Sequence, residues 1–279
     1  MKQIIKDILW KILTKANIDS AGLIVKLYPK GFFVCYNDVL GYKLWNKLDY
    51  ETEMRRLFCD ILVDDDVFVD AGANQGLYSI LAAMKSPEIK VFSIEPSKNA
   101  RKKLKLNILL NLRSNIQVIP FAVGLKHEDT ELNVCDGFES GMNSLRAICD
   151  ENNIYHSEKV SVQSLEFLYK TYKMKKISVI KIDCEGAELD ILNGATDLIF
   201  TRMRPYIIIE ISDKRLQPWG CTGYDIASLL KLNNYEITEP SQKLLNQVEY
   251  NSWNHTLFAY PMEKIHELKN RLKGKWTIS

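Results

Sequence analysis

The chain has 279 residues, a formal net charge of +2, 46% hydrophobic residues and 26% charged residues. This length is sufficient for one large or two small domains, and the composition is that of an ordinary globular protein. The small net charge argues against a nucleic-acid partner. The sequence contains no run of about 18 uncharged apolar residues that could cross a membrane. Its six cysteines have neither CxxC nor metal-ligand spacing, so we expect a reduced, cytoplasmic protein.

The first part of the chain, residues 1–62, carries no recognisable chemistry. Its sequence predicts a helix, then a short β-hairpin around Gly31–Trp45, then a helix from about Tyr50 to Leu62. The apolar residues on one face of the first helix are Ile4, Ile5, Ile8, Leu9, Ile12 and Leu13. We expect this face to pack on the body of the protein or on a second copy in a homodimer. Docking on an anionic membrane surface is the alternative, because lysines accompany the apolar face.

After this extension the sequence changes to alternating strands and helices. The predicted strands are Val67–Asp70, Lys90–Ile94, Ile116–Phe121, Ile177–Asp183 and Tyr206–Ile211, and the predicted helices are Gly76–Met84, Lys98–Asn111 and Ala187–Leu198. The segments that could complete the sheet are a helix over Tyr224–Leu232 and strands over Tyr235–Thr238 and Thr256–Tyr260. This alternation is typical of an α/β fold with a doubly wound, mostly parallel sheet. We expect one domain over residues 63–262 and a helical tail over 263–279.

One region departs from the alternation. Between the third and fourth predicted strands, Glu131–Cys135 and Lys159–Val162 have strand character, and the residues that follow Cys135 are rich in glycine, serine and asparagine. We interpret the two strands as an inserted hairpin. Because long loops in compact domains often carry function, residues 136–158 are a candidate lid or substrate-recognition element.

The most informative stretch is Val67–Tyr78. An apolar strand ends in Asp70, a turn from Gly72 to Gly76 follows, and a helix begins. Open α/β sheets bind nucleotide-like ligands at such a place, and we expect glycine there because a Cβ would hold the backbone away from the ligand. A dinucleotide fingerprint would have a glycine where Asn74 stands. An acid without a phosphate cradle favours a cationic cofactor that carries an amino acid, a description that S-adenosylmethionine fits.

A second acid, Glu95, ends the next predicted strand. At this separation from Gly76 it can accept hydrogen bonds from both ribose hydroxyls of an adenosine group. Capping of the following helix is the alternative role, although Ser97 could cap that helix unaided; we also place Ser97 in the predicted cofactor pocket. Phe121 and Ala122 end the third strand and could flank the adenine ring, although Phe121 could equally belong to the core.

A third group of charged residues lies at the end of the fourth predicted strand. Asp183 and Glu185 stand at the ligand-binding edge of the sheet, where two acids are costly unless they have partners or a task. Lys181 lies two residues before Asp183 and could share its strand face. For Glu188 a structural role is sufficient, because an acid in the first helical turn offsets the helix dipole. Cys184 is expected to be a small buried filler.

Five motifs together resemble the FkbM family of S-adenosylmethionine-dependent methyltransferases. They are VFVDAGANQGLYSI, FSIEPS, VIPFAVG, VIKIDCEGAELDILNGA and IIIEIS. The resemblance covers about residues 64–212, with a weaker similarity at Asn254–Phe258. It implies a class I, Rossmann-like methyltransferase fold with a seven-stranded sheet whose last strand is antiparallel. It also implies methyl transfer to a hydroxyl oxygen of a sugar, a glycan or a natural product.

The resemblance also implies roles for single residues. Those implied at the methionine end of the cofactor pocket are Asp70, Gly72, Asn74 and Gly76. Glu95 is implied to hold the ribose, and Asp183 and Glu185 are implied to face the substrate. The chain departs from the family where Leu-Asp-Asp is common, since Ser164–Phe167 reads Ser-Leu-Glu-Phe.

We expect Asp183 to be the base that removes the proton of the acceptor hydroxyl, steadied by Lys181. Glu185 is a substrate ligand or a second candidate base. His255 is another candidate, because imidazole titrates near neutral pH. A divalent ion that bridges the acids is the alternative, but no third ligand is evident in the sequence, so we expect no metal.

Two functions of other classes stay open at this point. A nicotinamide-dependent oxidoreductase could use the same sheet, although the missing G-x-G-x-x-G argues against it. A non-catalytic S-adenosylmethionine-binding protein is the other, although the retained acids argue against it. The sequence does not identify the acceptor; Trp219 and Tyr224 are candidate walls of its site.

Overall fold

The computed structural model describes residues 7, 8, 10, 12, 22–27, 30–146, 155–248 and 250–278. Most of the predicted N-terminal helix and the middle of the predicted 136–158 loop therefore lie outside the described residues. Of the predicted apolar face, Ile8 and Ile12 are described, and both are exposed. Trp10, which was not part of that face, is buried and contacts Tyr42 edge to face. Within the described ranges, no helix is long and apolar enough to span a membrane.

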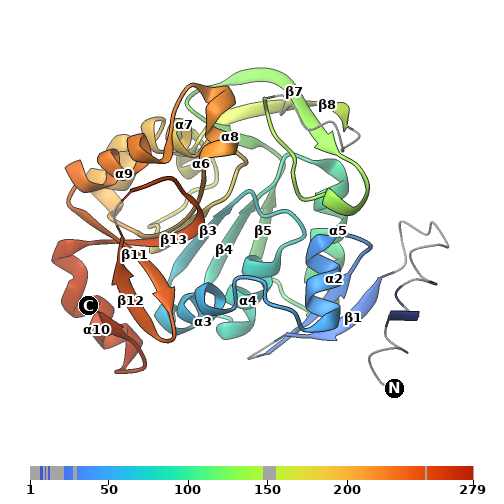
Figure 1. The fold of residues 1–279 in the computed structure, drawn as a ribbon, viewed down its shortest axis with the longest axis horizontal. Coiled ribbons are helices and arrows are strands. Elements are labelled where there is room, and N and C mark those ends of the chain that lie inside the picture. Colours follow the sequence, from blue (N-terminus) through green and yellow to red (C-terminus); the bar gives the residue numbers. More distant parts are fainter. Residues whose placement is uncertain are drawn as a thin grey trace.

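A nine-stranded sheet forms the centre of the protein (Figure 1). Its order is β14-β12-β11-β13-β10-β9-β3-β4-β5. The bounds are β3 Val67–Ala71, β4 Lys90–Ile94, β5 Ile116–Ile119, β9 Val179–Ile182, β10 Tyr206–Ser212, β11 Tyr235–Ser241, β12 Leu244–Gln247, β13 Asn254–Pro261 and β14 Thr277–Ile278. The five neighbouring strands β10, β9, β3, β4 and β5 are parallel to one another. Strand β13 is antiparallel to both of its neighbours, β10 and β11. The predicted α/β fold with a mostly parallel sheet is confirmed, but the sheet has nine strands instead of the predicted seven, because β12 and β14 extend it at one edge.

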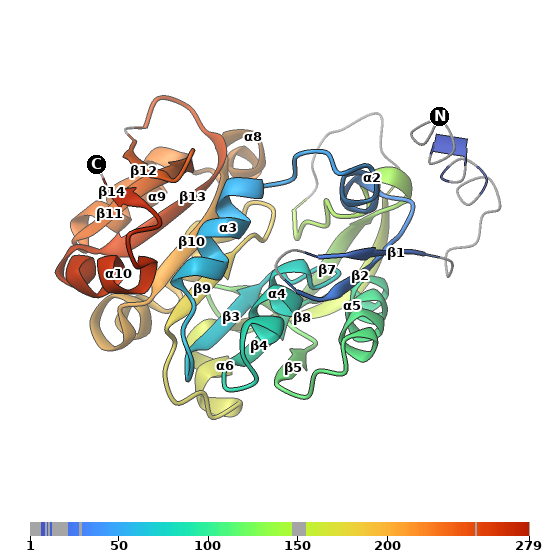
Figure 2. The same cartoon turned by 90° about the horizontal axis from the view of Figure 1, so that it is seen from below.

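Helices cover both faces of this sheet (Figures 1 and 2). Their bounds are α3 Thr52–Ile61, α4 Leu77–Lys85, α5 Lys98–Leu110, α6 Leu165–Thr171, α7 Glu188–Asn193, α9 Gly223–Leu232 and α10 Ile265–Leu272. Successive side chains of a strand point to opposite faces. Val67 and Val69 of β3 therefore pack with α6, α7 and α9, whereas Phe68 packs with α3, α4 and α10. All of β3 is buried, as expected of a parallel strand that is covered on both sides.

The N-terminal extension differs from the prediction. The hairpin consists of β1 (Leu23–Lys26) and β2 (Phe32–Cys35), and most of the remaining predicted hairpin is instead helix α2 (Val39–Asn46). The helix begins there because Asp38 caps it: its Oδ1 accepts a hydrogen bond from the Gly41 N–H at 2.8 Å. The predicted strand over Gly31–Trp45 is thus wrong after Cys35.

The inserted hairpin is confirmed. Its strands β7 (Glu128–Cys135) and β8 (Tyr155–Ser164) pair antiparallel and form a small sheet with β6 (Ala122–Gly124). The predicted strand Ile116–Phe121 ends early as β5, and the chain enters the second sheet after Pro120. Proline has no N–H to continue a ladder, so it separates the two sheets.

Gly72 allows β3 and β9 to approach each other at their carboxyl ends. Its φ is +79°, and a Cβ built there would lie 1.8 Å from the Asp183 carbonyl oxygen. The glycine is therefore required first by the neighbouring backbone of the protein, rather than by a bound ligand. The Gly72 and Ala73 N–H groups both donate to the Ile94 carbonyl at 3.0 Å, which joins the turn to β4 as well.

Gly72→Ala is expected to destabilise the protein by several kcal/mol, because the added Cβ cannot fit without moving β9. Gly137→Ala is the matched control: its φ is +77° and nothing lies within 4 Å of the added Cβ. The control isolates the backbone cost of a positive φ, about 1 kcal/mol. Urea unfolding of both variants measures the difference, and equal losses would contradict the steric explanation.

Candidate active site

A pocket opens where β3, β4, β9 and β10 end. About 1060 Å³ of space, the open mouth included, lies between its walls. The lining comes from the N-terminal extension, the turns after β3 and β4, the inserted hairpin, and the ends of β9 and β10. In an open α/β sheet, ligands bind at this edge.

Glu95 lines this pocket at the end of β4. The residue is 4% exposed, and its two oxygens accept the Asn74 and Ser97 N–H groups, both at 2.8 Å. Each oxygen keeps a second lone pair, so the carboxylate can still accept two ligand hydroxyls. Burial raises the pKa of Glu95 to about 7, although the two backbone hydrogen bonds oppose that rise. Its contact with ribose stays a prediction, for which this geometry is suitable.

The turn residues predicted to bind the cofactor occupy different places. Gly72 and Asn74 line the pocket, and Asn74 has a positive φ of 48°. Asp70 lies beneath the turn, where it is 1% exposed and accepts a hydrogen bond from Ser79 Oγ at 2.6 Å. It borders a smaller adjoining cavity instead of the main pocket.

Gly76 and Ser97 are not among the residues that line the pocket. Gly76 precedes α4 with a φ of +86°, and a Cβ there would lie 2.2 Å from Leu104 Cδ1, so this glycine lets α4 and α5 pack closely. Ser97 caps α5 by accepting the Ala100 N–H at 3.4 Å. Its own N–H holds Glu95, so Ser97 acts on the pocket through that carboxylate.

Part of the pocket lining is apolar. Phe121 and Ala122 belong to it, together with Val123 and with Leu132 of the inserted hairpin. An apolar wall beside Glu95 is suitable for an aromatic base attached to a ribose, so the predicted adenine contact is physically reasonable.

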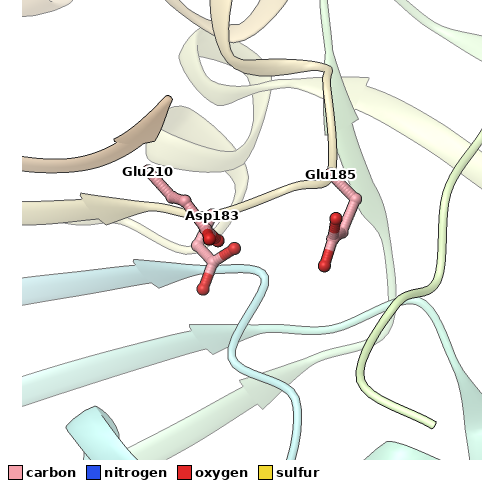
Figure 3. Close-up of side chains that lie close together, drawn as sticks. All are labelled: Asp183, Glu185 and Glu210. Carbon is pink, nitrogen blue, oxygen red and sulfur yellow. The ribbon is translucent and has the colours of Figure 1, made fainter. Parts of the chain in front are cut away.

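Three carboxylates gather where β9 and β10 end (Figure 3). Asp183, Glu185 and Glu210 each offer an oxygen within 4.8 Å of the others. The negative charge of Asp183 and burial raise the pKa of Glu210 well above its ordinary value, and the two side chains share a hydrogen bond. Of the two carboxyl groups, Glu210 is therefore the one that holds the shared proton.

Asp183 stays ionised because Lys181 lies beside it. Burial alone would raise the pKa of Asp183, but the Lys181 charge and the hydrogen bonds from Glu210 and Lys181 outweigh it, so the pKa lies below its ordinary value. Burial and the Asp183 charge raise the pKa of Glu185 to about 8, even though Arg215 Nε lies 3.0 Å from Glu185 Oε2. The site thus holds Asp183, whose pKa is lowered, next to two carboxyl groups whose pKa values are raised.

The structure does not bring His255 to this pocket. His255 lies on β13, pairs with Glu239 at 3.4 Å, and its side chain is 52% exposed. Its neighbour along the strand, Thr256, lies on the opposite face and donates to Glu51. Tyr224 is also remote from the pocket, in contact with Tyr250, so it does not form the predicted wall.

Among the pocket-lining residues that sequence reasoning missed are Glu210, Asp38 and Tyr50. The sequence does contain an indication of Glu210, because it is the one acidic residue in the otherwise apolar strand β10. Asp38 and Tyr50 come from the N-terminal extension, where no local motif indicates a site.

The presence of Glu210 also bears on metal binding, because the sequence analysis expected no metal on the ground that a third ligand was missing. We expected no third ligand beside Asp183 and Glu185, and that expectation is wrong. Three carboxylates form a donor set that a divalent cation could bind. However, two cations of the chain already lie in the cluster, with Lys181 at Asp183 and Arg215 at Glu185.

Residues 70–237, more than half of the chain, match the family described as "Methyltransferase FkbM domain". The chain belongs to this family. The resemblance seen in the motifs is thereby confirmed, and with it the identity of the protein as an S-adenosylmethionine-dependent methyltransferase. The nicotinamide-dependent and non-catalytic alternatives are set aside.

Curated relatives of this FkbM-family protein differ in length. "Methyltransferase 1" of Beauveria bassiana is 27% identical over 192 residues, which cover 61% of this chain and 76% of that one. "Hexuronic acid methyltransferase AglP" of Haloferax volcanii is 25% identical over 171 residues, 61% of this chain and 66% of that one. "AMB antimetabolite synthetase AmbE" of Pseudomonas aeruginosa is 24% identical over 228 residues; this chain spans only 10% of its length.

Among solved structures, the FkbM-family chain is similar to a SAM-dependent methyltransferase from Agrobacterium tumefaciens. The TM-score is 0.48 at 12% identity, and the match covers 87% of this chain and 71% of the other.

The raised pKa of Glu95 predicts a pH dependence of stability. Between pH 4.5 and about 7 the folded protein holds a proton on Glu95 that the unfolded chain has released. Stability of the ligand-free protein therefore falls as the pH rises through this window, by on the order of 3 kcal/mol from this group. Glu95→Gln should flatten that part of the curve, as measured by urea unfolding at pH 5 and pH 8. Glu88→Gln, at an exposed position, is the control; identical curves for wild type and Glu95→Gln would contradict the assignment.

Proposed function

We propose that this methyltransferase transfers a methyl group from S-adenosylmethionine to a hydroxyl oxygen of a sugar, a glycan or a natural product. The observation that carries the proposal is the position of Asp183, ionised and hydrogen-bonded to Glu210, in the same pocket as Glu95. The similarity to a relative named as a hexuronic acid methyltransferase supports a sugar acceptor. Methylation of oxygen needs a base at the acceptor, and this cluster supplies one.

The cofactor, when bound, supplies a methyl group on a positively charged sulfur, which needs no activation by the protein. The protein has to align the acceptor oxygen with that methyl and accept one proton. Glu95 and the Asn74 turn would fix the adenosine end at β3 and β4. Asp183 would take the hydroxyl proton as the new bond forms.

Lys181 and Glu210 keep the base in place. Lys181 is 4% exposed and lies 5.0 Å from the centre of the Tyr78 ring, so it has little freedom to move. Glu210 donates its proton to Asp183, and Lys181 donates to Asp183 Oδ2, so two neighbours hold the carboxylate in place. Glu185 is a poorer base at neutral pH because its pKa is about 8, so it is more suitable as a hydrogen-bond donor to the substrate.

Asp183→Asn should reduce kcat by about 10²-fold or more, the usual worth of a general base. Transfer of a labelled methyl group measures the rate, and calorimetry with S-adenosylhomocysteine should give a nearly unchanged Kd. Glu210→Gln is the matched control, because glutamine can still donate to Asp183; its kcat should fall only a few-fold. Wild-type turnover in Asp183→Asn, or an equal loss in both variants, would contradict the assignment of the base.

The same assay tests whether the acid cluster needs a metal. Because Lys181 and Arg215 already supply positive charge to it, activity should be unchanged after dialysis against EDTA. Loss of activity that Mg²⁺ or Mn²⁺ restores would instead mean that a cation on Asp183, Glu185 and Glu210 polarises the acceptor.

A further inference from the structure

Residues 137–143, which we call the flap, leave the inserted hairpin after β7 and reach α2, as both views of the fold show (Figures 1 and 2). Gly141, Met142 and Asn143 of the flap line the pocket. A Cβ built on Gly141 would lie 3.2 Å from Asn74 Nδ2, so the flap also contacts the turn after β3. The flap is therefore one wall of the place where the cofactor is expected to bind.

Hydrogen bonds fix one end of the flap. The Ser144 N–H donates to the Asn133 carbonyl at 3.1 Å, and the Asn133 N–H donates to the Ser144 carbonyl at 2.9 Å. Ser144 is 1% exposed, and its Oγ donates to the Glu185 carbonyl at 2.9 Å. Asn143 Oδ1 accepts the Cys135 N–H at 3.0 Å. This end is therefore joined both to β7 and to the turn that carries Glu185.

A pair of aromatic rings holds the other end of the flap. The Phe138 ring lies 6.0 Å from the Tyr42 ring of α2, edge to face, and the two residues are 44% and 36% exposed. Tyr42 in turn contacts the buried Trp10 at 5.6 Å. Within the described residues, no hydrogen bond joins 138–142 to another element. Gly137, at the base of this end, has a φ of +77° and nothing within 4 Å of an added Cβ. The backbone has space to move there.

We propose that the flap opens from α2 by breaking the Phe138–Tyr42 contact, and that this opening sets the rates at which the cofactor enters and S-adenosylhomocysteine leaves. Segments with few buried contacts open more readily than the core, and loops over ligand sites are drawn from such segments. Every cycle of methyl transfer requires this exchange, whichever acceptor is methylated. Tyr42 lies outside the matched residues 70–237, so the N-terminal extension controls the exchange although neither ring lines the pocket.

The test measures the exchange of S-adenosylhomocysteine in the full chain. Release of labelled ligand into an excess of unlabelled ligand gives koff, calorimetry gives Kd, and the two together give kon. Phe138→Ala should raise koff and kon together by about 2- to 10-fold, the usual worth of an aromatic pair, and leave Kd nearly unchanged. The two rates rise together because the flap gates both directions. A rise in koff alone, with a weaker Kd, would mean that Phe138 stabilises the bound ligand; that result, or unchanged rates, would overturn the proposal.

Variants of Tyr42 test whether the two rings act as one contact. Tyr42→Ala should raise both rates as Phe138→Ala does, and the double variant should show no further change, because each substitution removes the same contact. Tyr42→Phe retains the ring and should exchange the ligand as wild type does. Phe167→Ala is the matched control, since Phe167 of α6 is 46% exposed and does not line the pocket. Additive effects in the double variant, or equal acceleration in Phe167→Ala, would contradict the role of the pair.

Discussion

The buried ion pair between Lys181 and Asp183 is the interaction on which the rest of the active site depends. Lys181 is 4% exposed and lies on β9 directly beside Asp70 of β3. Burial would lower the pKa of Lys181, but Asp183, Glu51 and Asp70 outweigh it and hold the pKa well above its ordinary value. Without this cation the carboxylates would face one another in a low-dielectric site, where unpaired charge is very costly. One lysine thus allows an ionised base to exist next to Glu210.

A second constraint is the close approach of the chain at the turn after β3. Gly72 lets the backbone of Asp183 lie where any other residue would place its side chain. The turn is also bound to β4, since the Asn74 N–H donates to Glu95. The proposed cofactor end and the proposed acceptor end are therefore held together by backbone contacts, which gives them a fixed separation. Methyl transfer in line requires such a fixed geometry.

Local patterns predicted most of the fold. Lys90–Ile94 was predicted with its bounds, and the predicted inserted hairpin is present, because strand alternation and turn residues are properties of short segments. The errors have physical causes of longer range. Helix α2 was predicted as strand because Asp38 was not recognised as its cap, and the strand after Ile116 was predicted to be too long because Pro120 was not recognised as its end. His255 has suitable chemistry, but it lies outside the pocket and pairs with Glu239, which its sequence context does not indicate.

The sequence by itself determined the family, the cofactor and the strand that carries the proposed base. These conclusions depend on short motifs in which glycine, acidic and apolar residues are close in the chain, so the interactions that form them are local. The tertiary structure decided which residues complete the site. Glu210 comes from β10, and Asp38 and Tyr50 come from the N-terminal extension. They meet only because strand order and register bring distant segments to one edge of the sheet, and no single segment encodes that arrangement.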